Sequence, residues 1–411
     1  VVSHPHGNAN VRQAALAFAE AGLLSEFWTG VAWNPDWRFA RFAPARLRRQ
    51  LERRTVPPEV RPYLRLHPWR EALRLALPQR HLPRELAPAL SPNACHEDLD
   101  RRVSRAIARD AGAGIRVVYA YDHGALSSFQ SAARHGVRRV YDLPIGYWRA
   151  LEQTIREERD AWPGWDAIAP ALDFRTPTFA RKDRELELAD RIVVPSRFVA
   201  RTLAEHGRFA ADVSVVPFGA PAPVALGERE LDRPRGARLR LLYVGSLDLR
   251  KGIPYLLHAW AALRGIADLT IVGRGGDQCP PLLRALDGVR RIDSLPHAKI
   301  LRLMRDSDVF LFPTLFEGMA LVVPEAMSQG CAVVTTANSG AEDVIRDGEN
   351  GYLVPARSVE AIVARVVSLH EDRDRLRRVR EAAQATCAEL TWPRYRAQLR
   401  SVVSECLGAA A

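Results

Sequence analysis

Two carboxylates eight residues apart are the side chains of this sequence best placed to hold a polar ligand. Glu317 and Glu325 stand in the segment FEGMALVVPEAM. The apolar run before it has the length of a buried strand, so Glu317 follows that strand and Glu325 lies a little over two turns into the next helix. Because a carboxylate accepts two hydrogen bonds, the pair suits sugar or ribose hydroxyls. The alternative is a helix-end charge and a solvated helix face.

The backbone between the two carboxylates offers a second way to bind an anion. After Gly318, the predicted helix opens at Met319, Ala320 and Leu321. Unpaired N–H groups and the positive end of the helix dipole attract phosphate or sugar oxygens at such a position. We therefore expect these residues to face the same ligand.

Two cations follow another predicted strand, LLYVG, which ends at Gly245. Ser246, Arg250 and Lys251 come next. Arg suits bidentate contact with phosphate, whereas Lys acts as a point charge. Two fixed cations at such a position stabilise a ligand group that carries or develops negative charge, such as a phosphate. No DxD metal motif or His cluster stands nearby, and we predict a reaction without metal or cofactor; a solvent-facing turn is the alternative.

Weaker signals surround these residues. The glycines of GRGGDQ, from Gly273, would approach a phosphate, although a tight turn explains them equally well. In the first half, a glycine loop and the ends of later strands supply candidates for contacts with a second ligand in the cleft: His6, Gly7, Asn8, Asn10, His123, Asp142 and Tyr147.

The elements that position these residues have an α/β pattern. Short apolar runs alternate with longer helical patterns, which is typical of parallel sheets covered by helices. Strands are predicted over residues 1–3, 116–121, 139–143 and 191–195, and a helix over 10–21. Residues 28–91 are rich in Pro, Arg and Trp, and we interpret them as an insertion shaped for a partner or substrate.

A Pro- and Gly-rich segment after residue 216 separates the two halves. The chain has 411 residues, which suits two domains. We predict a first doubly wound domain over 1–218, a second over 219–390 and a final helix over 391–411. Ligands of such sheets lie at the carboxyl ends of the strands, in a cleft between the domains.

Composition narrows the function classes. The net charge of +11 favours anionic partners, with solvated Arg-rich faces as the alternative. No apolar run reaches the roughly 18 residues of a membrane span, and no secretion signal is visible. Five cysteines without CxxC spacing disfavour disulfides and structural zinc. We expect a cytoplasmic protein, held peripherally at the inner face of the membrane by its basic, Trp-containing first domain.

The motifs together resemble one enzyme family. The block EG-x-x-L-x-x-x-EAM, then G-x-x-VV, SGAEDVI and DGENGYLV, resembles the E-x7-E region of retaining family-4 glycosyltransferases with the GT-B fold. VGSLDLRKGIPYLLHAW, GRGGDQ and TWPRYRAQL resemble the same family. The resemblance implies two Rossmann-like domains facing across a cleft, with the C-terminal helix returning to the first domain.

The resemblance also implies substrates and roles. A nucleotide-diphosphate sugar would bind the second domain, and a glycan, lipid-linked or small-molecule hydroxyl acceptor the first. Glu317 would orient the sugar, Arg250 and Lys251 would stabilise the diphosphate, and Glu325 would hold the ribose. Arg291 and Ile292 would lie beside the nucleotide base, with surface packing as the alternative. This sequence departs from the family twice, with Ser246 at the usual arginine position and Pro144 at the usual histidine position.

Other functions fit less of the sequence. A sugar-nucleotide epimerase or a phosphorylase would use the same fold but not the family-4 details. A dinucleotide oxidoreductase would require a full GxGxxG after a strand, which the sequence lacks. A protein that only binds nucleic acid would not explain the carboxylate pair, and we expect no nucleic-acid partner.

Overall fold

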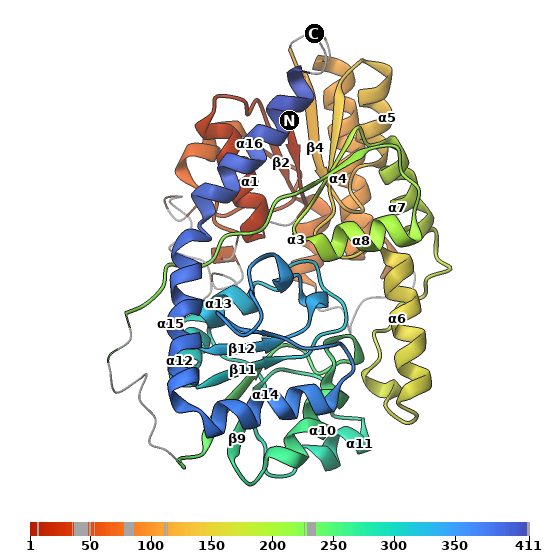
Figure 1. Cartoon of the computed structure of the whole chain (residues 1–411). Coiled ribbons are helices and arrows are strands. Elements are labelled where there is room, and N and C mark those ends of the chain that lie inside the picture. The colour runs from red at the N-terminus through yellow and green to blue at the C-terminus, as the bar shows by residue number, and fades with distance from the viewer. Residues whose placement is uncertain are drawn as a thin grey trace.

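The computed structural model describes residues 1–5, 8–34, 36, 48, 51–52, 54–77, 86–110, 112, 114–225, 227 and 236–408. These residues form two α/β domains, one above the other in Figure 1. Each is built on a parallel sheet with helices on its faces, as the alternating pattern predicts. The α/β class and the two Rossmann-like domains are confirmed.

The first domain holds a seven-stranded parallel sheet in the order β3-β2-β1-β4-β5-β6-β7. Its strands are β1 Val2–Ser3, β2 Phe27–Thr29, β3 Leu64–Leu66, β4 Val117–Tyr121, β5 Arg138–Asp142, β6 Arg191–Val194 and β7 Asp212–Val215. Its helices are α1 Ala9–Glu20, α3 Trp69–Ala76, α4 Pro92–Asp110, α5 Leu126–Arg134, α6 Trp148–Ala161, α7 Pro177–Leu188 and α8 Arg197–His206. β4 is wholly apolar or aromatic and β6 is apolar after its first residue, because helices bury both faces of the sheet there.

Part of the region interpreted as an insertion belongs to this sheet. β2 and β3 extend its edge in parallel register, Phe27 opposite Leu64 and Trp28 opposite Arg65. Each strand has only three residues, and β3 is partly exposed, so neither gives the long apolar run that marks a buried strand. The insertion interpretation was therefore wrong for these two segments.

The second domain holds a six-stranded parallel sheet in the order β10-β9-β8-β11-β12-β13. Its strands are β8 Leu239–Val244, β9 Ala267–Val272, β10 Arg290–Ile292, β11 Val309–Phe312, β12 Ala332–Thr335 and β13 Tyr352–Leu353. Its helices are α10 Ile253–Leu263, α11 Pro280–Ala285, α12 His297–Arg305, α13 Val322–Ser328, α14 Val359–Glu371 and α15 Arg373–Glu389. β8 and β11 are neighbours in the sheet, so the loops that follow them lie together.

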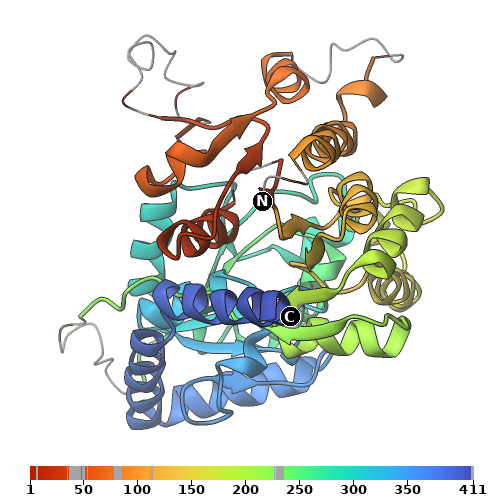
Figure 2. The ribbon, with the colours of Figure 1, turned by 90° about the horizontal axis from the view of Figure 1, so that it is seen from above.

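The chain crosses between the domains twice, after β7 and again before α16, Trp392–Gly408. The crossings touch each other. The Ala220 N–H donates to the Leu390 carbonyl at 2.7 Å, and a Cβ on Gly219 would stand 2.4 Å from the Trp392 nitrogen. α16 then lies beside α1 (Figure 2), where Arg396 bonds Glu20 at 2.9 Å. The returning C-terminal helix is confirmed.

Helix α6 connects the domains on another side. It belongs to the first domain but runs along the second (Figure 1). Its Glu158 is fully buried and accepts hydrogen bonds from Tyr255 Oη at 2.9 Å and Arg357 Nε at 2.5 Å. Both donors belong to the second domain, so the two domains meet directly through a buried carboxylate.

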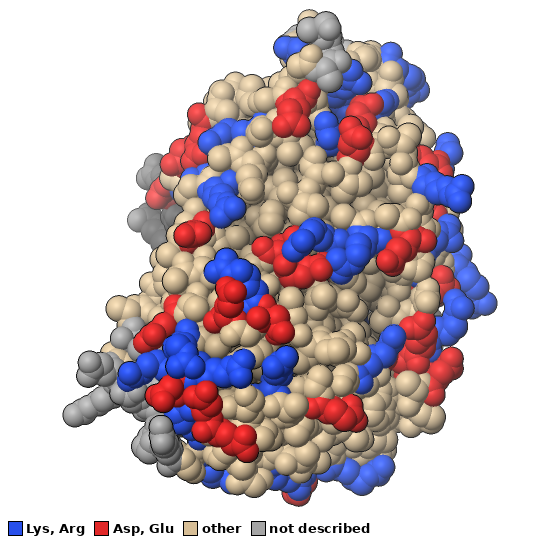
Figure 3. All heavy atoms as spheres, viewed as in Figure 1, with Lys and Arg blue, Asp and Glu red and all other residues tan. Residues whose placement is uncertain are grey.

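Positive and negative side chains are interspersed on the face shown in Figure 3. On this face the positive excess therefore forms no single patch. Among the described residues, no helix is long and apolar enough to cross a membrane. All five cysteines are buried free thiols.

Candidate active site

Glu317 lies where the loop after β11 meets the loop after β8. Its Oε1 atom accepts hydrogen bonds from Lys251 Nζ and, at 3.0 Å, from Arg250 Nη1. The hydroxyl of Thr314 is 3.4 Å from the same oxygen. All three charged side chains are largely buried. The structure thus brings together the three residues predicted to be catalytic.

A tight turn presents the two cations. Asp248 caps the 3-10 helix Leu249–Lys251, and its carboxylate accepts the Lys251 N–H at 3.1 Å. Gly252 ends this turn with φ +69°, and a Cβ there would stand 2.0 Å from the Pro313 carbonyl oxygen. Only glycine fits that approach, which brings the Lys251 turn against the loop that carries Glu317.

Side chains after β12 fix the loop that carries Glu317. Thr336 Oγ1 donates to the Thr314 carbonyl at 2.5 Å, and Asn338 Nδ2 donates to the Leu315 carbonyl at 2.9 Å. Thr335 Oγ1 reaches the Phe312 carbonyl at 2.6 Å. Each bond satisfies a backbone carbonyl at the end of β11 or in the irregular loop after it. The loop is therefore a rigid support for the carboxylate.

The predicted helix start after Gly318 was wrong. α13 begins at Val322, so Met319, Ala320 and Leu321 precede it. The Ala320 N–H donates to the Ser339 carbonyl at 2.9 Å, which removes it from the donors available to a ligand. The backbone conformation before α13 is therefore set by the contact with Ser339 and not by a helix that begins at Met319.

Glu325 lies on α13, away from Glu317's partners. Its Oε1 is 2.9 Å from His297 Nε2 of α12. Burial raises the pKa of Glu325, and the hydrogen bond with His297 opposes that shift. The carboxylate is one-fifth exposed, so an entering hydroxyl can reach it.

The weaker donor-side candidates gather at the ends of β8, β9 and β10. A Cβ on Gly273 would stand 1.8 Å from the Gly245 carbonyl, so these two glycines allow the strand ends to touch. The Ser246 hydroxyl is exposed and donates to Asp248 at 2.5 Å. Arg291 folds back onto the carbonyl of Gly275 at 3.0 Å. Ile292 is half-buried and packs against the core.

The first domain contacts the Glu317 loop through hydrogen bonds to the backbone carbonyls of that loop. The Gly146 N–H donates to the Glu317 carbonyl at 3.2 Å, and Ser196 Oγ donates to the Gly318 carbonyl at 2.6 Å. Ser196 also caps α8 by accepting the Val199 N–H at 3.3 Å. One serine therefore connects the start of a first-domain helix to the loop that carries Glu317.

The first-domain candidates separate into different places. His6 and Gly7 lie outside the described residues. Asn8 precedes α1 and is exposed, whereas Asn10 is buried inside it. Of the two described residues, only Asn8 is accessible to a ligand.

Asp142 is a core residue. It is 2% exposed and accepts a hydrogen bond from Tyr119, on the sheet face that packs against α1 and α16. Burial raises the pKa of Asp142 to about 7, and the tyrosine hydrogen bonds lower it. Its proposed place among ligand-contacting residues was wrong, because the carboxyl faces the core.

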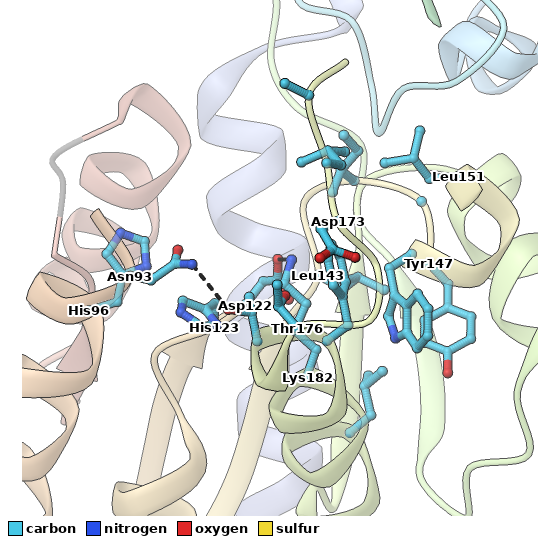
Figure 4. Close-up of a pocket in the computed structure, with 18 residues that line it drawn as sticks. Asn93, His96, Asp122, His123, Leu143, Tyr147, Leu151, Asp173, Thr176 and Lys182 are labelled. Atoms are coloured by element: carbon cyan, nitrogen blue, oxygen red, sulfur yellow. Dashed lines mark hydrogen bonds and ion pairs between the residues drawn. The ribbon is translucent and has the colours of Figure 1, made fainter. Parts of the chain in front are cut away.

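His123 and Tyr147 line a cavity of about 490 Å³ in the first domain (Figure 4). It opens where β4 and β5 end, at Asp122 and Leu143. His96, Asn93 and His123 lie at one side of the cavity and Tyr147 and Leu151 at the other (Figure 4). Gly146, which bonds the Glu317 carbonyl, is also part of the wall. The cavity therefore borders the catalytic loop.

Several residues of this site gave no signal in the sequence. Asn93, His96 and Lys182 stand on helices without a motif, and only the fold brings them to one cavity. Ser196 and Asp248 do show the Ser or Asp that begins a helix, which could have marked them as caps. Among the described residues, no three His, Cys, Asp or Glu side chains gather as a metal site requires. Metal independence stays a prediction.

The second domain matches a known family. Residues 238–372, which carry Arg250, Lys251, Glu317 and Glu325, match the model of Glycosyl transferases group 1. This part of the chain is thus similar to the group 1 glycosyltransferase domain. Glycogen synthase of Mycobacterium tuberculosis is 31% identical over 169 residues, 39% of this chain and 41% of the relative. D-inositol 3-phosphate glycosyltransferase of Nocardia farcinica is 29% identical over 226 residues, half of each chain. The chain thus spans about half or less of these relatives.

Solved glycosyltransferase structures share the whole architecture. Sucrose-phosphate synthase of Thermosynechococcus elongatus superposes with a TM-score of 0.67 over 99% of this chain and 98% of that chain, at 19% identity. HepE of Anabaena in complex with UDP-glucose gives a TM-score of 0.62 over 98% of both chains, at 15% identity. The chain has the GT-B fold, as the sequence resemblance implies. Membership of family 4 in particular stays a prediction.

Proposed function

We propose that this protein is a retaining glycosyltransferase that moves a sugar from a nucleotide-diphosphate donor to a hydroxyl acceptor, without a metal. The observation that carries the proposal is the convergence of Arg250 and Lys251 on Glu317 inside the group 1 domain. The HepE structure of the same fold holds UDP-glucose, which supports a nucleotide-sugar donor here.

The charges of the site give each residue a role. Without donor, Glu317 neutralises the two cations. A bound diphosphate competes for Arg250 and Lys251, which frees the carboxylate to accept sugar hydroxyls. The cations then stabilise the charge that develops on the leaving diphosphate. Glu325 holds the ribose, in competition with His297.

The configuration at the anomeric carbon is retained because the acceptor attacks from the side on which the diphosphate leaves, with no carboxylate acting as a nucleophile. The acceptor oxygen bonds the anomeric carbon as the bond from that carbon to the diphosphate oxygen breaks. The departing diphosphate takes the proton of the acceptor hydroxyl. Closure of the domains through Gly146 and Ser196 excludes water from this step.

The test is a thermal-shift panel of UDP-, GDP- and ADP-sugars, followed by transfer assays with and without chelator. The true donor stabilises the protein in proportion to its excess over the dissociation constant. Transfer with retained anomeric configuration, insensitive to chelator, supports the proposal. Epimer formation or sugar phosphate release without acceptor would assign an epimerase or a phosphorylase instead.

We also propose a cytoplasmic location with peripheral membrane contact through the first domain. Trp69 and Leu73 of α3 and Leu77, the residue after it, recur at spacings of four residues, with exposed fractions of 78%, 47% and 38%. Arg65 of β3 pairs with Glu26 at 3.0 Å and Arg70 of α3 with Asp98 at 3.4 Å, and an anionic lipid surface would compete for both cations. Flotation with anionic vesicles tests this contact, because Trp69→Ser should weaken it relative to Leu283→Ser, a change at an exposed leucine of the second domain.

A further inference from the structure

His123 has a conformation that a bulky residue adopts only when the structure holds it there. Its φ is +67°, in the left-handed region, and it immediately follows Asp122 at the end of β4. Such a conformation is unfavourable for a residue with a Cβ atom, and strained residues of this kind cluster at functional sites. The positive φ of His123 therefore makes it a candidate for a binding residue.

Glu185 of α7 holds this loop. The buried carboxylate accepts the His123 N–H at 2.8 Å, the Ala125 N–H at 3.0 Å and the Leu126 N–H at 3.1 Å. Tyr141 Oη adds a fourth hydrogen bond at 3.0 Å. These bonds determine the backbone of the loop independently of the imidazole, so the ring itself is left for another purpose.

The imidazole is buried without a partner. His123 is 4% exposed, and neither Nδ1 nor Nε2 has a hydrogen-bond partner in the structure. Burial lowers the pKa of His123 to about 4, so the ring is neutral at pH 7 and offers one donor and one acceptor. Leaving both unpaired is costly, and a ligand hydroxyl, which also donates once and accepts once, is the matching group.

The rest of the cavity selects against charge. Lys182 Nζ pairs with Asp122 Oδ2 at 2.6 Å, so these two charged groups neutralise each other. The carboxylate of Asp173, which also lines the cavity, pairs with Arg175 at 3.2 Å. Much of the remaining wall is apolar, with Trp148 packed against Phe179 at a ring distance of 5.1 Å and with Leu172. The cavity therefore combines paired charges, a neutral polar group at His123 and an apolar part.

We propose that this cavity binds the acceptor, that the acceptor is an uncharged hydroxyl-bearing molecule with an alkyl or aryl group, and that His123 hydrogen-bonds one of its hydroxyls. The proposal rests on the glycosyl transfer proposed above and names its acceptor class. His123 acts here as a binding residue.

Direct binding tests this without a donor. Isothermal titration of the purified protein with alkyl and aryl glycosides, the corresponding free sugars and sugar phosphates should rank the glycosides at least about tenfold tighter. His123→Gly should weaken glycoside binding about tenfold while thermal stability is unchanged or higher, because glycine relieves the strain. His123→Asn, which tolerates positive φ and keeps a donor and an acceptor, should retain part of the affinity.

A second pair of variants tests the apolar end. Leu172→Ser should reduce the preference for glycosides over free sugars, and Leu283→Ser, at a leucine of similar exposure in the second domain, should not. Equal binding of free sugars, tighter binding of sugar phosphates, or unchanged binding by His123→Gly would overturn the proposal. Because these titrations contain no donor, failure of the proposed transfer appears separately, as no response to any nucleotide sugar.

Discussion

Gly318 of the second domain lies against Pro144 of the first so closely that a Cβ on Gly318 would stand 1.7 Å from the Pro144 carbonyl oxygen. No side chain fits that space without moving backbone. The contact places a glycine between the carboxylate Glu317 and the first domain. It also shows what stands at the position of the family histidine: the Pro144 backbone packs against the donor-side loop.

Gly318→Ala should therefore separate the domains at the catalytic loop. We expect transfer to fall on the order of 100-fold, because a displacement of about 1 Å costs that much in catalysis. Small-angle scattering should show a larger radius of gyration. Gly265→Ala is the matched control, since no atom lies within 4 Å of a Cβ there. An active, compact Gly318→Ala protein would contradict this role.

Lys251→Ala should lower kcat by about 10²–10³-fold, because a fixed cation at the developing diphosphate charge is lost. Stabilisation by the donor in the thermal-shift assay should weaken as well. Lys299→Ala, at an exposed lysine of the same domain, should leave both unchanged. If Lys251→Ala and Lys299→Ala transfer sugar equally well, Lys251 does not contact the donor.

Asp142→Asn should change how stability depends on pH. The pKa of Asp142 is about 7 in the folded protein and near 4 when unfolded, so the folded state favours the protonated form. This contribution is fully present below about pH 4 and is lost as pH rises through 7. The variant should therefore gain on the order of 4 kcal/mol relative to the parent between pH 4 and pH 7. Urea unfolding across this range measures it, and parallel curves would refute the assignment.

Arg357→Ala should destabilise the contact between α6 and the second domain. It removes one of the two hydrogen-bond donors to the fully buried Glu158 and leaves Tyr255, at a cost of about 3 kcal/mol. Tyr255→Phe removes one hydrogen bond and should cost about 1 kcal/mol. Arg346→Ala breaks only an exposed pair with Glu349 and should stay within about 0.5 kcal/mol. Denaturant midpoints decide among these values.

The sequence predicts the strands that are buried on both faces. β11 and β12 are continuous apolar runs because helices cover both sides of the sheet, so their positions follow from composition alone. β2, β3 and β13 escape prediction because they are two or three residues long and lie toward the sheet edges. Short edge strands take their structure from neighbours, and a single sequence does not display those neighbours.

The candidate site likewise contains residues that sequence motifs predict and residues whose position depends on the fold. The donor-side residues share motifs with a known family, and the adjacency of β8 and β11 brings Lys251 to Glu317. The start of α13 and the core position of Asp142 depend on contacts with Ser339 and Tyr119, which are distant in sequence. His123 was one of several candidates by position. Its strain and unpaired ring become visible only in three dimensions.

The contact between the two crossings restricts how the domains can move. Gly219 and Ala220 in one crossing are held to Leu390 and Trp392 in the other, so the polypeptide passes between domains at one point and not two. Two bodies joined at one point can rotate about it but cannot slide apart. A swing that opens the domains about this point would have to break the contact of Glu158 with Tyr255 and Arg357.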